Sequence, residues 1–351
     1  MRCRRLWAWP SELRRSGVLG INARNLGFVS GLNPRKLYPR VDDKSVTKRI
    51  CDAERIPVPQ TYAVLERYGD IRRFGKIIGN RQQFVIKPAC GAGGRGVLAI
   101  AQHDGQNFHV SSGQVIPLAE LRHHLSTTLS GLYSLGGRTD KVIVEEQIAG
   151  HPAFENLAFG GTPDIRIIVL RGTPIMAMLR LPTKESKGRA NLHQGAIGLG
   201  LDLETGRTFG GVWHNHAITR HPESDLPVRG IAVPFWTDVL TIAAKLCRVL
   251  ELGYVGVDIV LDAKRGPVVL EANARPGLAI QVANRSGLLS EIWALTVRAA
   301  RIPALVGVVA DGHDSTSPAP ANPRDPDPAT IERGRRRRCA NRRRLTGSWE
   351  G

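Results

Sequence analysis

Residues 253–277, GYVGVDIVLDAKRGPVVLEANARPG, predict a β-hairpin that carries a few polar residues on an apolar frame. The run 254–261 is apolar except for Asp258, and 267–271 is a second apolar run that ends in a glutamate. Between them, residues 264–266 read Lys-Arg-Gly, which is typical of a turn. We therefore expect two neighbouring antiparallel strands.

This hairpin can place Asp258 beside Glu271, with Asn273 two residues further along on the same face of the second strand. Two carboxylates and an amide are hard oxygen ligands, which suit Mg²⁺ when phosphate oxygens and water complete the coordination. An ordinary polar strand end would explain a single aspartate equally well. Three oxygen ligands on one hairpin favour a metal site.

A glycine-rich loop, CGAGGRG at residues 90–96, follows a predicted strand at 83–87. Its spacing fits G-x-G-x-x-G, but a dinucleotide site needs a helix next, and the short apolar run 97–101 predicts a strand. A hairpin tip of this kind can fold over phosphates, because glycines let backbone N–H groups approach an anion, and Lys87 can add an ammonium group. A flexible tip with a solvated lysine is the alternative.

The predicted strand 142–148 contains two adjacent acids, Glu145 and Glu146. Neighbouring strand residues point to opposite faces, so the two cannot share one role. One of them can accept hydrogen bonds from adenine or ribose while the backbone of the segment reads the adenine edge. A solvated acidic end of an edge strand is the alternative.

Another predicted hairpin, with strands at 164–170 and 174–181, is followed by the polar and basic loop 184–195. Arg166 is the third residue of the first strand and Arg189 lies in the loop. Arginine can clamp a carboxylate or phosphate with two parallel hydrogen bonds, and the loop is long enough to act as a lid. A solvated basic surface loop is the alternative.

Helices are predicted at 44–55, 118–129, 235–250 and 287–300, where apolar residues recur at helical spacing, and Asp43 can cap the first. Strands broken by isolated helices indicate α+β layers rather than regular βαβ winding.

Composition divides the chain into three parts. We expect a short N-terminal region at 1–42, irregular over 1–16, a folded domain at 43–305, and a disordered tail at 306–351 that is rich in Pro and Asp and then in Arg.

The net charge of +18, from 49 Lys and Arg against 31 Asp and Glu, suggests a nucleic-acid partner. Residues 1–49 carry +9 and 311–351 carry +3, so only +6 remains on the central part. This distribution argues against a nucleic-acid partner, and only the tail leaves that question open. Five scattered cysteines without C-x-x-C spacing indicate neither a zinc site nor a disulfide framework. With no secretory signal or membrane span evident, we expect a cytoplasmic protein with reduced cysteines.

Taken in order, these motifs resemble the ATP-grasp superfamily of carboxylate–amine ligases. Asp164-Ile165-Arg166 and the Asn-Leu-His-x-Gly element at 191–195 look most like the α-L-glutamate ligase-like proteins, which are related to the ribosomal-protein glutamate ligase branch. The resemblance covers roughly residues 17–300. It implies an ATP-grasp fold, in which two α+β subdomains clamp ATP between antiparallel sheets, with a reduced N-terminal region.

The resemblance also implies roles for individual residues. ATP would be bound by Lys44, Lys87, Gly91, Gly93, Gly94, Gly96, Glu145, Glu146 and Ile148. Arg166 and Arg189 would bind the transferred phosphate or the substrate carboxylate, with Asn191 beside them, and Arg275 would stabilise the oxyanion of the tetrahedral intermediate. Mg²⁺, or Mn²⁺ in its place, would be held by Asp258, Glu271 and Asn273.

The implied activity is an ATP-dependent ligase that attaches glutamate or a related amino acid to a peptide-like acceptor through an acylphosphate. Phosphoryl transfer of this kind depends on positioning and charge neutralisation, and needs no nucleophilic side chain. One alternative is an ATP-grasp kinase that phosphorylates a small-molecule hydroxyl, and another is a nucleic-acid-binding protein that uses its Arg-rich termini. The histidines at 123–124 and 214–216 match no motif and are read as surface residues.

Overall fold

The computed structural model describes residues 9–91, 93–134 and 136–301, with side chains to residue 294. By its internal contacts the chain divides into two units, 1–298 and 299–351. All elements described below belong to the first unit, except that the last helix extends three residues into the second. The predicted tail at 306–351 lies outside the described residues.

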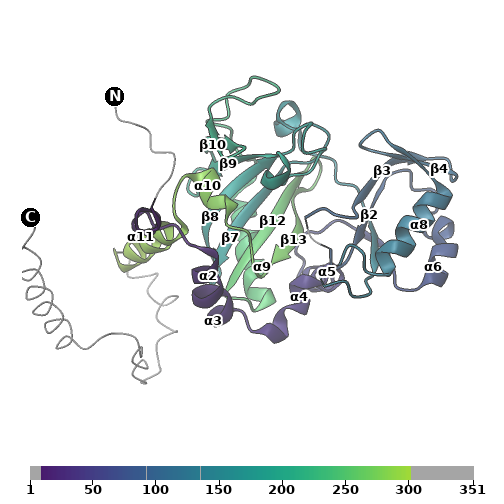
Figure 1. Cartoon of the computed structure of the whole chain (residues 1–351), viewed down its shortest axis with the longest axis horizontal. Coiled ribbons are helices and arrows are strands. Elements are labelled where there is room, and N and C mark those ends of the chain that lie inside the picture. The colour runs from purple at the N-terminus through teal and green to yellow at the C-terminus, as the bar shows by residue number, and fades with distance from the viewer. Residues whose placement is uncertain (1–8, 92, 135, 302–351) are drawn as a thin grey trace, which may run out of the picture. The chain divides into compact units, whose positions relative to one another are not determined.

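A six-stranded antiparallel sheet, the small sheet, has the order β1-β6-β2-β3-β4-β5 (Figure 1). Its core contains Phe74, Phe84 and Phe108 together with Leu121 and Leu125, all at most 1% exposed. Helices α6, α7 and α8 pack against it. Its strands are β1 Thr61–Leu65, β2 Phe84–Pro88, β3 Leu98–His103, β4 Asn107–Val110, β5 Val115–Pro117 and β6 Val142–Glu145.

A seven-stranded antiparallel sheet, the large sheet, has the order β11-β10-β9-β8-β7-β12-β13. Its central strands are apolar almost throughout because both faces are covered. On β7, Ile167 belongs to the core beneath α9, whereas Ile168 belongs to the core beneath α10. Its strands are β7 Asp164–Leu170, β8 Thr173–Leu181, β9 Ile197–Leu201, β10 Thr208–Trp213, β11 His216–Ile218, β12 Tyr254–Asp262 and β13 Gly266–Asn273.

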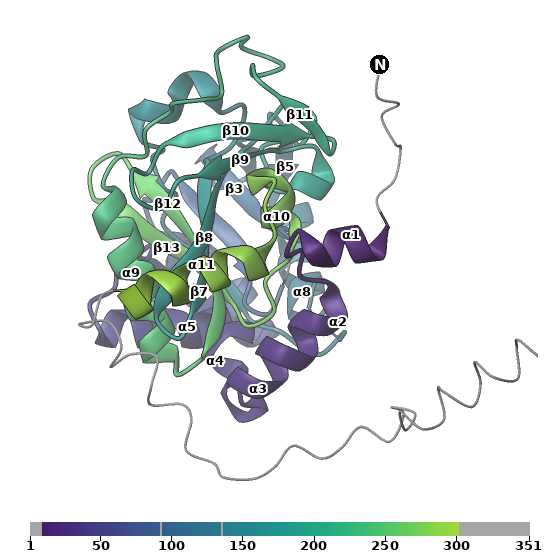
Figure 2. The same cartoon turned by 90° about the vertical axis from the view of Figure 1, so that its left-hand side faces the viewer.

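Figure 2 views the side of the large sheet where α10 and the N-terminal helices lie, whereas α5 lies between the two sheets (Figure 1). Four short helical turns supplement the helices, at Asn25–Val29, Arg35–Leu37, Pro152–Leu157 and Leu192–Gln194. The helices are α1 Pro10–Arg15, α2 Ile21–Arg24, α3 Ser30–Leu32, α4 Pro39–Asp42, α5 Lys44–Ala53, α6 Tyr68–Arg72, α7 Phe74–Ile78, α8 Leu118–Leu129, α9 Trp236–Leu250, α10 Ala279–Asn284 and α11 Leu288–Arg301.

The α+β architecture confirms the prediction, and every strand pairing in the two sheets is antiparallel. Asp43 caps α5 as expected, accepting a hydrogen bond from Ser45 N at 2.8 Å. Two expectations were wrong in detail. Residues 10–15, expected to be irregular, form α1, which begins at Pro10, and the strand expected to reach Ile148 ends at Glu145. No helix among the described residues is long and apolar enough to cross a membrane.

The N-terminal region is joined to the large sheet through Asn33, a buried side chain at the end of α3. Its Nδ2 donates to Tyr254 O at 2.6 Å and to Ala274 O at 3.0 Å, and its Oδ1 accepts from Tyr254 N at 3.0 Å. One amide thus satisfies three backbone groups at the hairpin formed by β12 and β13.

Replacing Asn33 by alanine should lower the free energy of unfolding by about 3 kcal/mol, because three buried backbone groups lose their partner. Urea unfolding measures this directly. The exposed Asn22 on α2 provides a matched control, and Asn22→Ala should change stability by less than about 0.5 kcal/mol. Equal stability of the two variants would contradict the role of Asn33.

Candidate functional site

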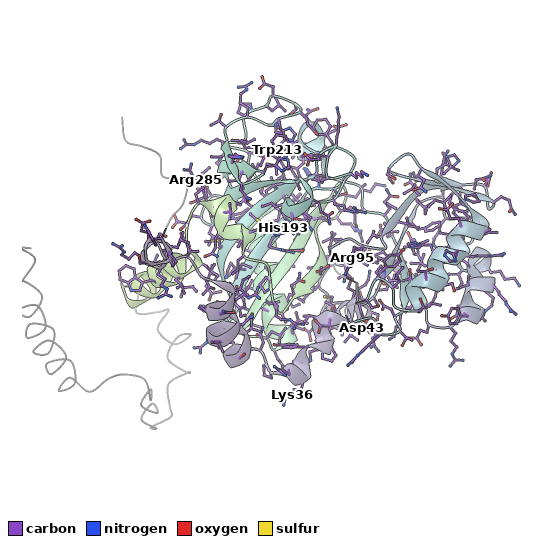
Figure 3. The ribbon with its side chains drawn as sticks, viewed as in Figure 1. Lys36, Asp43, Arg95, His193, Trp213 and Arg285 are labelled. Carbon is purple, nitrogen blue, oxygen red and sulfur yellow. The ribbon has the colours of Figure 1, made fainter. Side chains whose placement is uncertain are left out.

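A cavity of about 1020 Å³ lies where the small and large sheets face each other, and residues from both line it. The glycine loop and β6 contribute from the small sheet, and β7, β12, β13 and the loop 187–193 contribute from the large sheet. Arg95 and His193, which both line it, come from these two sides (Figure 3). Such a volume is typical of a site for a small molecule or cofactor.

The glycine loop joins β2 to β3 as a hairpin, as the sequence predicts. Gly93, Gly94 and Gly96 all have positive φ, between 65° and 73°, which glycine adopts without strain. Of the predicted loop residues, Gly91, Gly93 and Gly94 line the cavity, and Gly96 does not. Lys44 reaches the loop from α5, donating from Nζ to Gly91 O at 2.6 Å.

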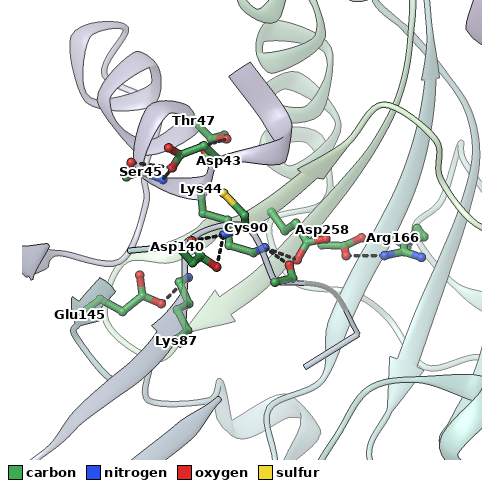
Figure 4. A network of polar contacts seen from close by, with 12 residues as sticks. Asp43, Lys44, Ser45, Thr47, Lys87, Cys90, Asp140, Glu145, Arg166 and Asp258 are labelled. Atoms are coloured by element: carbon green, nitrogen blue, oxygen red, sulfur yellow. Dashed lines mark hydrogen bonds and ion pairs between the residues drawn. The ribbon is translucent and has the colours of Figure 1, made fainter. Parts of the chain in front are cut away.

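Lys87 and Glu145 lie on neighbouring strands of the small sheet, and both line the cavity. Glu145, 3% exposed, forms an ion pair with Lys87 at 2.5 Å (Figure 4) and another with Lys48 of α5. Burial alone would raise the pKa of Glu145, but the two ammonium groups lower it below the ordinary carboxyl value. Lys48 is therefore part of this cluster.

The two predicted adenine-strand acids therefore both have partners within the protein. Glu146 pairs with Arg265 at 2.8 Å and accepts a hydrogen bond from Gln60 N at 3.1 Å. Neither carboxylate is free in this structure to read adenine or ribose. Glu145 at the end of β6, and the segment from Glu146 to Ile148 that follows it, still line the cavity.

Two aspartates and two arginines form a buried network on the large sheet. Arg166 donates to both oxygens of Asp258, at 2.7 and 2.5 Å, and Arg180 donates to Asp258 Oδ2 at 2.9 Å (Figure 4). Arg180 also forms a bidentate pair with Asp164. Burial would raise the pKa of Asp258, but Arg166 and Arg180 bring it down to about 2. Asp258 is therefore ionised at neutral pH.

Arg180 was not among the site residues expected from sequence. The strand register could have identified Arg180, because it lies directly opposite Asp164 in the hairpin of β7 and β8. An arginine and an aspartate at the ends of two buried strands need each other to offset the cost of burial.

The predicted metal ligands do meet. Asp258 lies opposite Glu271 in the register of β12 and β13, and all three predicted ligands line the cavity. Among the described residues, no cluster of three or more His, Cys, Asp or Glu side chains could hold a metal. A set of two carboxylates and one amide nevertheless matches Mg²⁺, which is commonly bound by one or two carboxylates together with substrate phosphates.

The geometry at these three side chains leaves coordination capacity. Asp258 Oδ1 accepts one hydrogen bond and Oδ2 accepts two, so one of the about four lone-pair positions of the carboxylate remains. Within the part of the chain that the structure describes, the only ion pair of Glu271 is with Lys44, at 3.7 Å. The buried Nδ2 of Asn273 has no hydrogen-bond partner among the described residues, and rotating the amide would place its oxygen there. The donor set fits Mg²⁺.

The basic loop contributes cations without counter-charges. Arg189 lies against Gly94 of the glycine loop, and neither Lys187 nor Arg189 forms an ion pair with any described residue. Asn191 lines the cavity but uses its Oδ1 to accept from His193 N at 3.0 Å, capping a short helical turn. This end of the cavity favours an anionic ligand.

Arg275 is not brought together with the other predicted residues. Its guanidinium lies over the ring of Tyr38, 5.1 Å from the ring centroid, and 3.7 Å from Asp42. It does not line the cavity, and its side chain is 51% exposed.

The chain is similar to a known protein family in sequence and to solved structures in fold. A family model described as sugar-transfer associated ATP-grasp matches residues 23–296. No curated protein matches the chain in sequence. Similar solved structures include the ATP-grasp ligase PsnB complexed with minimal precursor, at 15% identity, covering 79% of this chain and 63% of PsnB, with a TM-score of 0.42. The chain thus spans less than two thirds of PsnB.

Two further solved structures are similar to the same extent. D-cycloserine synthetase DcsG has 16% identity, coverage of 76% of this chain and 72% of DcsG, and a TM-score of 0.41. D-alanine–D-alanine ligase from Bacillus anthracis has 15% identity, coverage of 76% of this chain and 70% of the ligase, and a TM-score of 0.41.

Proposed function

The chain belongs to the sugar-transfer-associated ATP-grasp family, and from this premise we propose that it is an ATP- and Mg²⁺-dependent ligase joining a carboxylate to an amine. The ATP-grasp fold expected from the sequence is thereby established. One observation carries the proposal. Lys87 and the glycine loop on one sheet, and Asp258 and Glu271 on the other, line a single cavity. We further propose that the protein is cytoplasmic. We also propose that the folded domain at 43–305 carries the activity.

In the proposed site, Lys44, Lys87 and the amides of the glycine loop bind the ATP phosphates. Asp258, Glu271 and Asn273 would hold Mg²⁺, which supplies charge neutralisation for phosphoryl transfer when bound. The segment from Glu145 to Ile148 would contact adenine through its backbone, since both acid side chains are already paired.

The proposed reaction has two steps. The substrate carboxylate attacks the γ-phosphorus of ATP, forming an acylphosphate and releasing ADP. The amine then attacks the acyl carbon, forming the amide, and the C–O bond to phosphate breaks. Arg166 and Arg189 would orient the carboxylate and the transferred phosphate, with Asn191 beside them. Arg275 is left out, because it lies away from the cavity.

The family assignment does not identify the substrate. Lys187 and Arg189, which form no ion pair with any described residue, support an anionic substrate. Glutamate or a related amino acid remains our first candidate because of the α-L-glutamate ligase-like motifs. The description of the matched family extends the candidates to sugars that carry a carboxylate or an amine. Mg²⁺ is the proposed metal, with Mn²⁺ as an untested substitute.

The proposal predicts ADP release only when ATP, Mg²⁺, a carboxylate and an amine are all present. A panel of amino acids, short peptides, uronic acids and amino sugars should be screened by coupled ADP release, with mass spectrometry of each product. An amide product supports the ligase. A phosphorylated hydroxyl product would establish the kinase alternative instead, and salt-sensitive RNA binding without ATP binding would favour the nucleic-acid alternative.

A further inference from the structure

Both ends of the glycine loop contact residues that lie close together in sequence. These residues are His124 on α8, and Tyr133, Ser134 and Asp140 between α8 and β6. Leu121 and Leu125 bury one face of α8 in the core of the small sheet. This fixes the helix, so any group that it directs at the loop has a defined position.

The first end of the loop is held through Asp140, a buried carboxylate just before β6. Cys90 N donates to its two oxygens, at 3.0 and 3.2 Å (Figure 4), and Ser134 Oγ donates to Oδ2 at 2.5 Å. Gly91 forms an antiparallel β-bridge with Ser134. The loop therefore leaves β2 in a fixed direction.

The second end of the loop meets His124 and Tyr133. His124 Nε2 lies 3.1 Å from Gly96 O, and because a carbonyl can only accept, Nε2 carries the proton and donates. The His124 ring packs on Tyr133, with centroids 5.4 Å apart. A Cβ on Gly96 would lie 2.5 Å from Tyr133 Cδ2, so the backbone of the loop rests directly on that ring.

This placement corrects the sequence interpretation of His124 as a surface residue. His123 is exposed, but His124 is half-buried, and burial lowers the pKa of its imidazole, so the ring is neutral at neutral pH. No substrate or nucleotide group is needed to explain its position.

The tip of the loop is held far less. From the residues that the structure describes, Gly93 O receives only a long contact from Gln194 Nε2, at 3.5 Å, and Gly94 lies near the side chain of Arg189. Gly93 and Gly94 have positive φ, which permits them to change conformation at little cost. Among the described residues, the two ends of the loop are thus held more firmly than Gly93 and Gly94.

We propose that His124 is a positioning residue for the nucleotide-binding loop, and that its hydrogen bond to Gly96 O keeps the loop oriented toward the ATP phosphates before ATP arrives. Its relevance to ATP rests on the proposed function. Without this bond, the backbone amides of the loop must be ordered on binding, so affinity for ATP falls while the residues that carry out phosphoryl transfer are unchanged.

The test compares two substitutions in the full chain. His124→Leu keeps an apolar group against Tyr133 but cannot donate, whereas the side-chain amide of His124→Gln can reach Gly96 O as Nε2 does. Hydrogen exchange by mass spectrometry, without nucleotide, should show faster exchange of residues 93–97 in His124→Leu and near wild-type exchange in His124→Gln. The Kd for ATP should rise about five- to tenfold in His124→Leu only, as expected for one lost hydrogen bond.

His123→Ala, which removes the exposed neighbour on the same helix, should match wild type in both measurements. Unchanged loop exchange in His124→Leu, or equal exchange in the Leu and Gln variants, would overturn the inference. Exchange is measured without ATP, so it still decides the role of His124 if the wild-type protein does not bind ATP, a result that would instead refute the proposed function. Thermal unfolding of each variant separates loop loosening from global destabilisation.

Discussion

Asp258→Asn should abolish ATP-dependent turnover, with kcat falling by at least about 10³-fold, a loss typical of removing a group that neutralises charge in the transition state. The substitution removes one of the two carboxylates proposed to hold Mg²⁺. It also leaves Arg166 and Arg180 with less counter-charge in a site where Asp258 is 5% exposed. Breaking a buried ion pair in this way should lower the free energy of unfolding by about 3–5 kcal/mol.

Glu271→Gln separates the loss of turnover from the loss of stability that Asp258→Asn should cause together. The side chain of Glu271 is 27% exposed, and its only ion pair among the described residues is a long one to Lys44, so stability should change by less than about 1 kcal/mol. Turnover should nevertheless collapse, and the apparent affinity for Mg²⁺ should fall. The exposed Asp238→Asn on α9 serves as the control for loss of one negative charge. If Glu271→Gln kept full activity at low Mg²⁺, the proposed metal site would be wrong.

Local patterns explain why the sequence predicted much of this site. Asp258 and Glu271 were placed side by side because strand alternation and one tight turn determine a hairpin register, and the structure pairs them directly. The glycine loop was assigned to a hairpin because an apolar run, not a helical pattern, follows it. Both inferences need only residues close together in the chain.

Partnerships between distant segments were not predictable in the same way. Glu145 was expected to face a nucleotide, but Lys48 is 97 residues away in sequence and is brought to it on α5, which packs against α9 and β13 of the large sheet. Arg275 follows the hairpin directly, yet the chain turns it out over Tyr38. Short strands such as β5 and β11, with three residues each, carry too few residues for a periodic pattern.

The second large effect concerns stability and follows from the cluster of Lys48, Glu145 and Lys87. Glu145→Gln should lower the free energy of unfolding by about 3–5 kcal/mol, because it leaves two ammonium groups, with side chains only 7% and 10% exposed, without their shared counter-charge. Urea unfolding at neutral pH measures the loss. Glu66→Gln, which removes a surface pair with Lys141 from a side chain that is 58% exposed, should cost less than about 0.5 kcal/mol.

The pH dependence of this loss identifies its electrostatic origin. The pKa of Glu145 is lowered in the folded protein, so its contribution to stability is present above the ordinary carboxyl pKa of about 4.3 and is lost as pH falls through the folded value. Wild type and Glu145→Gln should therefore converge in acid. Burial lowers the pKa of Lys48, and without Glu145 it falls further, so the variant should recover stability as pH rises and Lys48 loses its proton. The difference between the two proteins should thus be greatest near neutral pH. A difference independent of pH would mean that Glu145 acts through packing and not through its charge.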